Sequence, residues 1–363
     1  MVDSFLTTRL NRLRLAGTYR KLPGNVTGVD FWSNDYLGLA QQPNSPAVHP
    51  PGSTGSRLIS GDHRDYHTLE ARIAAYHGQP AALVFNSGYT ANLGLLSALL
   101  HRTDTIVYDE LSHACCRDGI RLGQARALRF RHNDLEDLQI QLAKARGDGQ
   151  VFVLTEGRFS MDGDLAPLRE IMAICMASGA RLIVDEAHSG GIEGEKGAGL
   201  VAALGLQKQV FATVITYGKA FGCHGAAILG NPALREYLVN TCRPFIYTTG
   251  PAPAQWEGIA RAYERMEQLH TTQLTYLQNN ITHFREAAVA SGLTARLADV
   301  SGPIQVVAYP GNAAVLEAEA ACREAGLLVK AIRSPTVAVG QERLRICLHA
   351  FNREEDITRL VEL

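Results

Sequence analysis

Residues 210–222 have the sequence VFATVITYGKAFG. The apolar part, 210–216, predicts a strand that is buried on both faces, as in the parallel sheets of α/β proteins. The loop that follows carries Lys219 between Gly218 and Gly222. A lysine that loses its water shell in such a loop has a lowered pKa, as imine formation with an aldehyde requires. The stretch therefore predicts an α/β fold with a reactive lysine at a strand end; a surface lysine in a turn is the alternative.

Short apolar runs alternate with helical patterns throughout the region between Ala81 and Gly230. We expect strands at 81–86, 105–108, 151–155, 181–184, 210–216 and 225–229. Pro167 opens a helical stretch whose apolar stripe stops before Gly179. Asn133 and Glu136 form a capping-box pattern at the start of another helix. This order predicts a large, mostly parallel sheet that is covered by helices on both faces.

The sequence from Trp256 onward predicts a long helix and then a smaller α+β domain. Apolar residues recur there at three- and four-residue spacing, which is typical of an amphipathic helix. Further on we expect strands at 303–309, 327–332 and 343–348, a helix at 313–325, and a last helix capped by Asn352. The expected organisation is an N-terminal arm at 1–45, a large domain at 46–265 and a small domain at 266–363.

Composition and charge exclude several classes of function. The net charge of −1 provides no broad basic surface, so neither nucleic acid nor an anionic membrane is an expected partner. No apolar run reaches the roughly 20 residues that span a bilayer, and residues 1–20 lack the apolar core of a secretion signal. Seven cysteines without a C-x-x-C pair predict a reducing, cytoplasmic setting. Cys115 and Cys116 are expected to be packing residues rather than a redox centre.

Polar side chains follow the predicted strands at the edge where open α/β sheets bind ligands. Asp185 ends an apolar strand, and the protonated nitrogen of a pyridine ring would be a suitable partner for its buried charge. His188 could bond the phenolate oxygen of such a ring, and His113 could stack on it. The helix that opens at Ser87-Gly88-Tyr89 offers N–H groups to a phosphate, which Thr216 is also placed to contact. Each residue by itself also fits a capping or packing role.

Two arginines of the last predicted strand suit the carboxylate of a substrate. Arg343 and Arg345 alternate along this strand and therefore share a face. A guanidinium group binds a carboxylate with two parallel hydrogen bonds. Either arginine could reach inward while the other forms a surface pair, and the residues alone do not choose between them.

Longer motifs occur in order along the chain. They are Ser33-Asn-Asp-Tyr-Leu-Gly-Leu39, Gly55-Ser-Arg-Leu-Ile-Ser-Gly61, Phe85-Asn-Ser-Gly-Tyr89, Asp109-Glu-Leu-Ser-His113, Arg131-His-Asn133, Thr155-Glu-Gly-Arg-Phe-Ser-Met-Asp-Gly163, Asp185-Glu-Ala-His188, Thr216 to Lys219, Phe245-Ile-Tyr-Thr-Thr249 and Arg333-Ser-Pro-Thr336. Over nearly the whole chain they resemble the α-oxoamine synthases, which are pyridoxal-phosphate enzymes. The resemblance implies the α/β fold of a fold-type I transferase, with a large, mostly parallel, seven-stranded-type sheet domain and a smaller C-terminal α+β domain.

The resemblance also implies roles for individual residues. Lys219 would be the Schiff-base lysine and would later move protons. The implied contacts to pyridoxal 5'-phosphate are Asp185 at the pyridine nitrogen, His188 and Ser160 at the ring oxygen, His113 on the ring face, and Gly88, Tyr89 and Thr216 at the cofactor or its phosphate. The active site would be shared in a homodimer, with Thr248 or Thr249 offered to the neighbour's phosphate. Asn34, Thr336 and Arg345 would address the amino-acid substrate, and Arg20 the acyl substrate.

The implied reaction is a decarboxylative condensation of L-alanine with an acyl thioester, such as pimeloyl-CoA or an acyl-carrier-protein thioester, in biotin biosynthesis. Lys219 would remove the α-proton of alanine. One departure concerns residues 41–51, QQPNSPAVHPP, where relatives usually have a helix that these prolines forbid. The alternatives are a sister synthase acting on glycine or serine, a nucleotide-binding oxidoreductase suggested by Gly190-Gly191, and a catalytically silent partner subunit.

Overall fold

The computed structural model describes residues 4–20, 22–24, 26–42, 51–145, 149–334 and 336–363. The chain forms two compact units. The larger unit contains residues 34–160 and 164–275, and the smaller unit contains residues 1–33, 161–163 and 276–363. The division falls inside helix α10 (Pro253–Ala290), about ten residues after the boundary expected at 265/266. It also assigns residues 1–33 to the C-terminal unit, whereas the sequence suggested a separate arm at 1–45.

Residues 29–31 join the smaller unit through backbone hydrogen bonds. Strand β1 (Val29–Asp30) pairs in parallel with β10 (Leu327–Leu328). The carbonyl of Phe31 also accepts a hydrogen bond from the N–H of Cys347, at 2.8 Å. Partners that lie about 300 residues apart leave no local pattern in the sequence, so this association could not be predicted.

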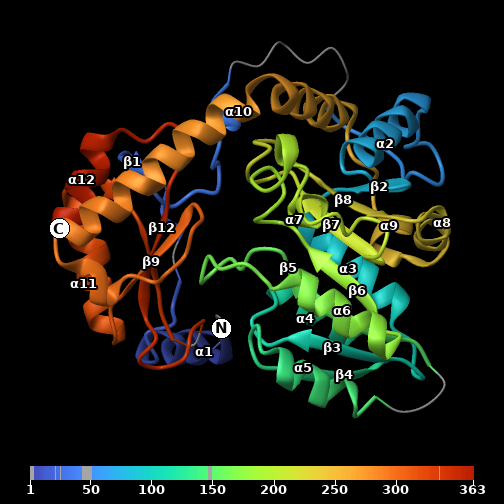
Figure 1. Ribbon diagram of the computed structural model, residues 1–363, viewed down its shortest axis with the longest axis horizontal. Helices are drawn as coiled ribbons and strands as arrows, with labels where there is room; N and C mark the ends of the chain where they lie inside the picture. The colour runs from blue at the N-terminus through green and yellow to red at the C-terminus, as the bar shows by residue number, and fades with distance from the viewer. Residues whose placement is uncertain (1–3, 21, 25, 43–50, 146–148, 335) are drawn as a thin grey trace. The chain divides into compact units, whose positions relative to one another are not determined.

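The larger unit is built on a seven-stranded sheet in the order β2-β8-β7-β6-β5-β3-β4 (Figure 1). All neighbouring strands are parallel except β8, which is antiparallel to β2 and β7. The mostly parallel sheet is therefore confirmed. Its strands are β2 (Ala81–Phe85), β3 (Thr105–Asp109), β4 (Arg126–Phe130), β5 (Val151–Glu156), β6 (Arg181–Asp185), β7 (Ala212–Thr216) and β8 (Ala226–Gly230).

Strand β4 is the one strand of this sheet that the sequence did not predict. It lies at the edge of the sheet, next to β3. Its residues, RALRF, are mostly exposed or half-buried, and only Phe130 is buried. An edge strand has a neighbouring strand on one side only and therefore needs no continuous apolar run. The apolar run that predicted the other strands is missing here.

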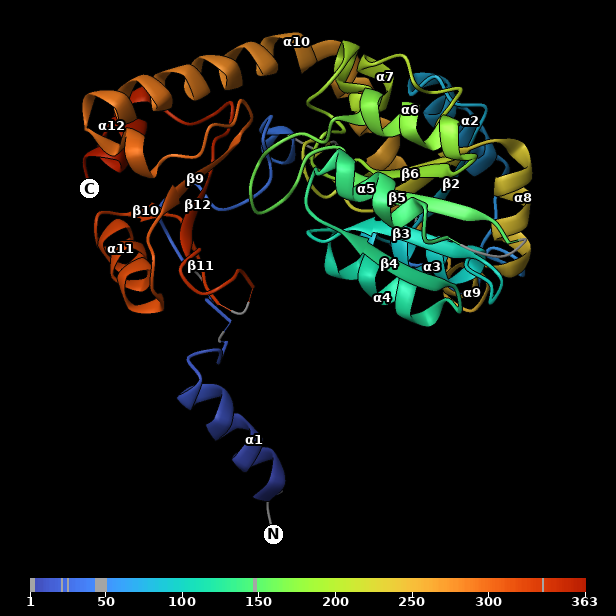
Figure 2. The ribbon, with the colours of Figure 1, turned by 60° about the horizontal axis from the view of Figure 1, so that its bottom comes forward.

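Helices cover both faces of the sheet, as Figure 2 shows for α5 and α6 on one face and α3 and α4 on the other. These helices are α3 (Gly88–Leu99), α4 (Ala114–Leu122), α5 (Leu135–Leu142) and α6 (Leu168–Ser178). Side chains alternate between the two faces along each strand. Ile183 packs in the core with α3 and α4, whereas Leu182 and Val184 pack with α5 and α6. By the same alternation, Asp185 faces α3 and α4.

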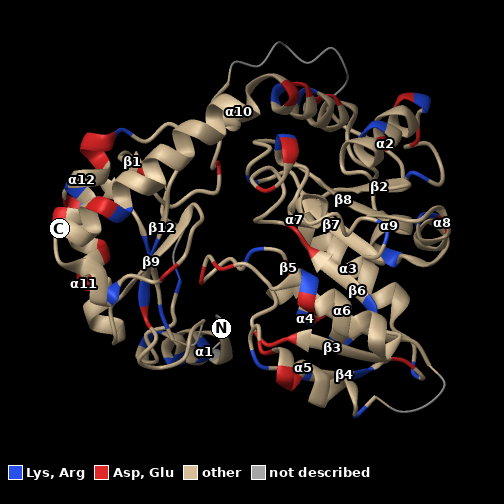
Figure 3. Cartoon of the chain, viewed as in Figure 1, with Lys and Arg blue, Asp and Glu red and all other residues tan. Residues whose placement is uncertain are grey.

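The other helices of the chain have the following bounds. They are α1 (Ser4–Leu15), α2 (Arg64–Tyr76), α7 (Leu200–Ala203), α8 (Pro232–Thr241) and α9 (Arg243–Ile246), with the short 3-10 turns η1 (Leu39–Gln41), η2 (Glu195–Gly197) and η3 (Leu293–Arg296). Both signs of charge occur on α10 (Figure 3). Glu257 and Arg261 of this helix form an ion pair. Among the described residues, no helix is long and apolar enough to cross a membrane.

The smaller unit contains an antiparallel sheet in the order β11-β12-β9 and two helices. These elements are β9 (Ile304–Ala308), β11 (Lys330–Ile332), β12 (Arg343–Cys347), α11 (Asn312–Glu324) and α12 (Glu354–Glu362). The strand expected at 327–332 is divided in two, because β10 pairs with β1 whereas β11 pairs with β12.

Two helix starts differ from the expectation. Asp134, not Asn133, caps α5, and its side chain accepts a hydrogen bond from the N–H of Asp137. Asn133 has a left-handed φ of 52°, which an asparagine tolerates better than most residues. Asn352 does not cap α12: its side-chain oxygen accepts from the N–H of His349, and its amide donates to the carbonyl of Asp30. The start and end expected for α6, after Pro167 and at Gly179, are confirmed.

His132 links two carboxylates just beyond the end of β4. Its Nδ1 lies 3.1 Å from the carboxylate of Asp109, and its Nε2 lies 2.8 Å from that of Asp164. Burial by itself would lower the pKa of His132, but the hydrogen bonds and charges of the two carboxylates outweigh it and raise the pKa to about 10. The imidazolium therefore stabilises the folded chain at neutral pH.

We predict that the stabilisation by His132 decreases as the pH rises. A histidine with a raised pKa contributes fully below its unfolded value of about 6.5 and loses the contribution as the pH approaches about 10. The free energy of unfolding of the wild type should exceed that of His132→Gln by at least about 1 kcal/mol near pH 6.5, and the difference should shrink toward pH 10. Urea unfolding of both proteins across this range measures the difference.

The matched control is His283→Gln, because the ring of His283 contacts the hydroxyl of Thr358 at 2.8 Å instead of a carboxylate. A difference between wild type and His132→Gln that stays constant over the pH range would contradict the assignment of the two ion pairs.

Candidate functional site

A pocket of about 190 Å³ lies at the edge of the large sheet where the parallel strands end. It is formed entirely within the larger unit. Its lining residues are Gly88, Tyr89, Asn92, His113, Cys115, Glu156, Asp185, Ala187, His188, Thr216 and Lys219. The structure thus brings together seven of the residues singled out in the sequence: Gly88, Tyr89, His113, Asp185, His188, Thr216 and Lys219.

Asp185 is the acidic group of this pocket and is only 3% exposed. Its Oδ2 accepts a hydrogen bond of 2.7 Å from the side-chain amide of Asn92. Its Oδ1 accepts one of 2.9 Å from the backbone N–H of Ala187. A buried carboxylate needs such donors to carry its charge, and a cation within the pocket would complete its partners.

Asn92 was not predicted as a site residue. It lies on α3, one turn after Gly88, in a helix whose other buried residues are all apolar or glycine. A single buried asparagine in such a helix is itself a signal, because its amide must find a partner. The sequence does not say which partner, since Asp185 follows 93 residues later.

Glu156 lies at the end of β5, beside Asp185 in the register of the sheet. Its Oε1 accepts a hydrogen bond of 2.6 Å from the backbone N–H of His113. Burial, together with the charge of Asp185, raises the pKa of Glu156 well above its ordinary value. The protonated form of Glu156 is therefore favoured next to the carboxylate of Asp185.

His113 lies at the N-terminus of α4, and its ring is held by its own helix. The Nδ1 atom accepts a hydrogen bond from the backbone N–H of Cys115 and lies 2.9 Å from the sulfur of Cys115. A hydrogen bond from Cys116 and one with His113 lower the pKa of Cys115 to about 6. The predicted burial of both cysteines is confirmed, but Cys115 also lines the pocket, so packing does not describe it fully.

His188 is held by a residue that the sequence analysis missed. The Nδ1 of its ring forms a hydrogen bond of 2.7 Å with the hydroxyl of Tyr36, which is fully buried. The same hydroxyl donates to the side-chain oxygen of Asn34 at 3.1 Å. Asn34, expected to address the substrate, is therefore connected to His188 through Tyr36.

The loop of Lys219 is tight because of its glycines. The N–H of Gly222 donates to the carbonyl of Lys219, and the N–H of Cys223 donates to the carbonyl of Tyr217. Gly222 has a φ of +65°, and a Cβ at this position would collide with the backbone of Ala40. This close approach fixes the backbone that carries Lys219.

The first turn of α3 suits a phosphate group. Ser87 caps the helix, and its side chain and that of Thr90 form a reciprocal capping box. A Cβ at Gly88 would lie only 3.1 Å from the hydroxyl oxygen of Thr216, so a side chain there would crowd the pocket. Open space between a helix N-terminus and a hydroxyl group is a suitable cradle for an anion.

The remaining predicted site residues lie elsewhere. Ser160 and Thr248 are half-buried and Thr249 is exposed, and none of the three lines this pocket. Arg20 and Thr336 line a separate cavity of about 410 Å³ in the smaller unit, together with Lys330 and Arg333. Residues 43–50 of the proline-rich segment lie outside the described residues.

Arg343 and Arg345 have different surroundings within the smaller unit. Arg343 forms an ion pair with Asp162. Arg345 is buried, with 6% of its surface exposed. The sequence left open which arginine forms a pair near the surface, and the structure assigns that pair to Arg343.

The groups at this sheet edge fit pyridoxal phosphate. They are a lysine, a carboxylate held by hydrogen-bond donors, two imidazoles and a helix N-terminus. The lysine matches its aldehyde, the carboxylate its ring nitrogen and the helix N-terminus its phosphate. Fold and site together define a pyridoxal-phosphate enzyme of fold type I.

Comparison with known proteins supports the same class of enzyme. The family model for aminotransferase class I and II matches residues 26–363. The 8-amino-7-oxononanoate synthase of Hahella chejuensis is 40% identical over 341 residues, covering 92% of this chain and 85% of the relative.

Solved structures of similar fold also include pyridoxal-phosphate enzymes. The 8-amino-7-oxononanoate synthase of Francisella tularensis has a TM-score of 0.79 at 31% identity, covering 92% of this chain and 96% of that one. The serine palmitoyltransferase of S. paucimobilis with bound pyridoxal phosphate and myriocin has a TM-score of 0.88 at 28% identity, covering 99% of this chain and 95% of that one.

The chain belongs to the aminotransferase class I and II family and, within it, to the α-oxoamine synthases related to 8-amino-7-oxononanoate synthase. It is a pyridoxal-phosphate-dependent acyltransferase. The nucleotide-binding oxidoreductase considered from Gly190-Gly191 is thereby excluded.

We predict that Asn92→Ala weakens cofactor binding. The substitution leaves Oδ2 of Asp185 without its amide donor, and a hydrogen bond to a charged group contributes about 1.5–3 kcal/mol. The dissociation constant for pyridoxal phosphate should therefore rise by about tenfold or more, as measured by titration of the cofactor-free chain followed by visible absorbance.

The control is Asn240→Ala, because the amide of Asn240 donates only to a backbone carbonyl on the exposed face of α8. Equal cofactor affinity of Asn92→Ala and wild type would mean that Asp185 does not depend on this hydrogen bond.

Proposed function

We propose that this chain condenses L-alanine with a pimeloyl thioester to form 8-amino-7-oxononanoate, carbon dioxide and the free thiol of the carrier, in biotin biosynthesis. The single observation that carries the proposal is the meeting of Lys219 and the donor-held Asp185 in one pocket of a chain about 40% identical to 8-amino-7-oxononanoate synthases. The bound cofactor supplies an electron sink for the α-carbon of the amino acid.

We assign the proton chemistry to Lys219. Its amine would hold the aldehyde of the cofactor and would supply the base for the α-proton of alanine. Asp185 presents a fixed carboxylate to the ring nitrogen, and Asn92 and the N–H of Ala187 hold it in place. Burial and the neighbouring Asp185 raise the pKa of Glu156 and so favour its protonated form beside that carboxylate.

We assign the orienting contacts to the two histidines and to the start of α3. His113 would lie against one face of the ring, and His188 would bond the ring oxygen together with Ser160. Tyr36 supports the second role, since its buried hydroxyl bonds Nδ1 of His188 and holds the ring in one orientation. Gly88, Tyr89 and Thr216 would contact the cofactor and its phosphate.

The substrate assignments rest on the family resemblance. Arg345, Asn34 and Thr336 would bind the amino acid, with Arg345 at its carboxylate. Arg20 would bind the acyl substrate, and the cavity that it shares with Lys330 and Arg333 supports an acyl chain with an anionic end. The proposal also includes a cytoplasmic homodimer in which Thr248 or Thr249 of each subunit reaches the neighbour's phosphate.

The first test of this function is Lys219→Ala. Loss of the amine should remove the visible absorption of the lysine-bound cofactor and lower the condensation rate by about 100-fold or more. Absorbance spectra and a thiol-release assay measure the two effects. Lys208→Ala, which removes an exposed lysine, is the control and should retain both properties. A Lys219→Ala protein that keeps the visible band would contradict the assignment.

The second test concerns the substrates. Alanine, glycine and serine should be combined with acetyl-CoA, pimeloyl-CoA and palmitoyl-CoA, and thiol release recorded; alanine with a pimeloyl thioester should be the best pair. Pimeloyl attached to acyl-carrier protein should be tested beside the CoA thioester. A higher kcat/KM for glycine with acetyl-CoA, or for serine with palmitoyl-CoA, would identify a sister synthase instead.

We further predict that Arg20→Gln acts on the free carboxylate of the pimeloyl group. The kcat/KM for pimeloyl-CoA should fall by about tenfold or more, while that for the uncharged heptanoyl-CoA should change little, because only the first substrate loses a charge-assisted hydrogen bond. Arg9→Gln, on the exposed part of α1, is the control. An equal decrease for both substrates would contradict a contact with the carboxylate.

A further inference from the structure

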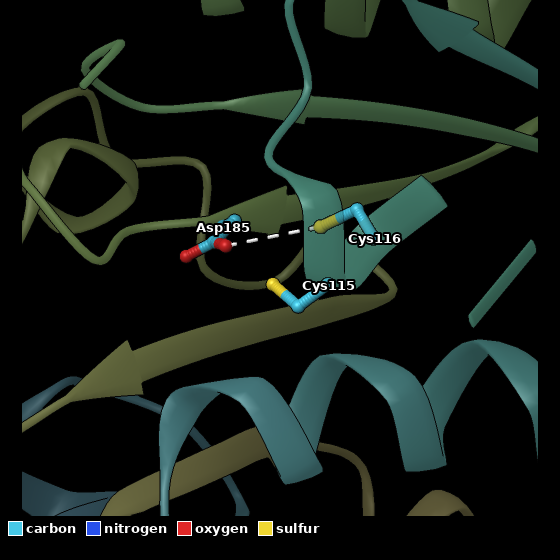
Figure 4. A group of neighbouring side chains, drawn as sticks. All are labelled: Cys115, Cys116 and Asp185. Carbon is cyan, nitrogen blue, oxygen red and sulfur yellow. Dashed lines mark hydrogen bonds between the residues drawn. The ribbon is translucent and has the colours of Figure 1, made fainter. Parts of the chain in front are cut away.

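Two thiols and a carboxylate form a compact cluster beside the pocket. Figure 4 shows Cys115, Cys116 and Asp185, with the Cys116 thiol directed toward the carboxylate. The donor atoms of the three side chains all lie within 4.8 Å of one another, and the Cys116 sulfur is 3.9 Å from Oδ2 of Asp185. Within the described part of the chain, no other group of three such side chains brings its donor atoms as close.

The spacing of these atoms is near that of a metal site. A tetrahedral zinc ion with Zn–S distances of about 2.3 Å and Zn–O distances of about 2.1 Å places its ligand atoms about 3.5 to 3.8 Å apart. Shifts of roughly 1 Å or less would therefore bring the three donors to bonding distance. Thiolate ligands select soft or borderline cations over magnesium and calcium, which prefer oxygen.

The cluster is also reachable and rigidly supported. Cys115 and Asp185 both line the 190 Å³ pocket, so an ion can approach from its interior. Cys115 and Cys116 are fixed in the first turn of α4, and Asp185 is fixed by Asn92 and by the N–H of Ala187. The fourth position of a tetrahedral ion would face the pocket, where a water molecule can complete the coordination.

We propose that the cofactor-free chain binds one zinc-like cation, Zn²⁺ or Cd²⁺, through Cys115, Cys116 and Asp185. This site shares Asp185 with the place assigned to the ring nitrogen of pyridoxal phosphate. A metal ion on Asp185 would neutralise the carboxylate and repel a pyridinium nitrogen, so the two cations compete for the same negative charge. The cation and the cofactor therefore exclude each other, and free zinc-like ions oppose loading of the enzyme.

The test is a titration of the full-length, cofactor-free chain with Cd²⁺, followed by ultraviolet absorbance. Thiolate ligation gives a sulfur-to-cadmium charge-transfer band that oxygen and nitrogen ligands do not give. We expect this band to saturate at one equivalent per chain. The same titration of the chain loaded with pyridoxal phosphate should require at least about tenfold more Cd²⁺, and added Cd²⁺ should raise the apparent Kd of the cofactor by a corresponding factor.

Cys115→Ser and Cys116→Ser should each weaken Cd²⁺ binding by at least about tenfold and reduce the band. Cys322→Ala, which removes a buried thiol of the smaller unit, is the matched control and should bind as the wild type does. Circular dichroism checks that each variant is folded. Wild-type affinity and band intensity in the double variant Cys115→Ser/Cys116→Ser would overturn the proposal.

A second measurement needs no variant. Co²⁺ in a tetrahedral site with sulfur ligands has strong visible absorption, whereas Co²⁺ bound by scattered surface groups is only weakly coloured. The wild-type, cofactor-free chain should show the strong bands with Co²⁺ and lose them when Zn²⁺ is added. Weak bands, or bands unchanged by saturating pyridoxal phosphate, would mean that the ion does not occupy this cluster.

Discussion

The site depends on keeping one carboxylate charged at the buried end of a strand. Asp185 ends β6 in the middle of a hydrophobic sheet, where an ionised group is costly unless donors or a cation compensate for the lost water. Asn92 and the N–H of Ala187 provide part of that compensation, and burial raises the pKa of the neighbouring Glu156, which favours its protonated form. A cation in the pocket would add a further partner to this carboxylate, which is why the arrangement suits a protonated pyridine ring.

The fold places the other groups around that carboxylate by simple geometry. In a parallel sheet the carboxyl ends of the strands meet at one edge, so β3, β5, β6 and β7 deliver His113, Glu156, Asp185 and Thr216 to the same pocket. The start of α3 adds its N–H groups for an anion, and the glycine-bounded loop after β7 adds Lys219. All residues that line this pocket therefore come from the larger unit.

The two thiols next to Asp185 add a property that this reaction does not require. A carboxylate prepared for one cation is also a ligand for another when sulfur donors lie within reach. The partly buried ion pairs around His132 serve a different purpose, since they join the ends of neighbouring elements and His132 does not line the pocket. In the larger unit, the ion pairs of His132 thus support the fold, whereas Asp185 faces the ligand pocket.

Much of the fold followed from the sequence, because strands such as 151–155 and 181–184 are unbroken apolar runs whose periodicity is local. For the same reason the sequence placed Asp185, His113 and Lys219 at strand ends, and the chain order of its motifs indicated the family. The edge strand β4, the pairing of β1 with β10 and the contacts Asn92–Asp185 and Tyr36–His188 were decided only by the tertiary structure. These features join residues that are distant in the chain or depend on which side of a strand is exposed, and local periodicity contains neither kind of information.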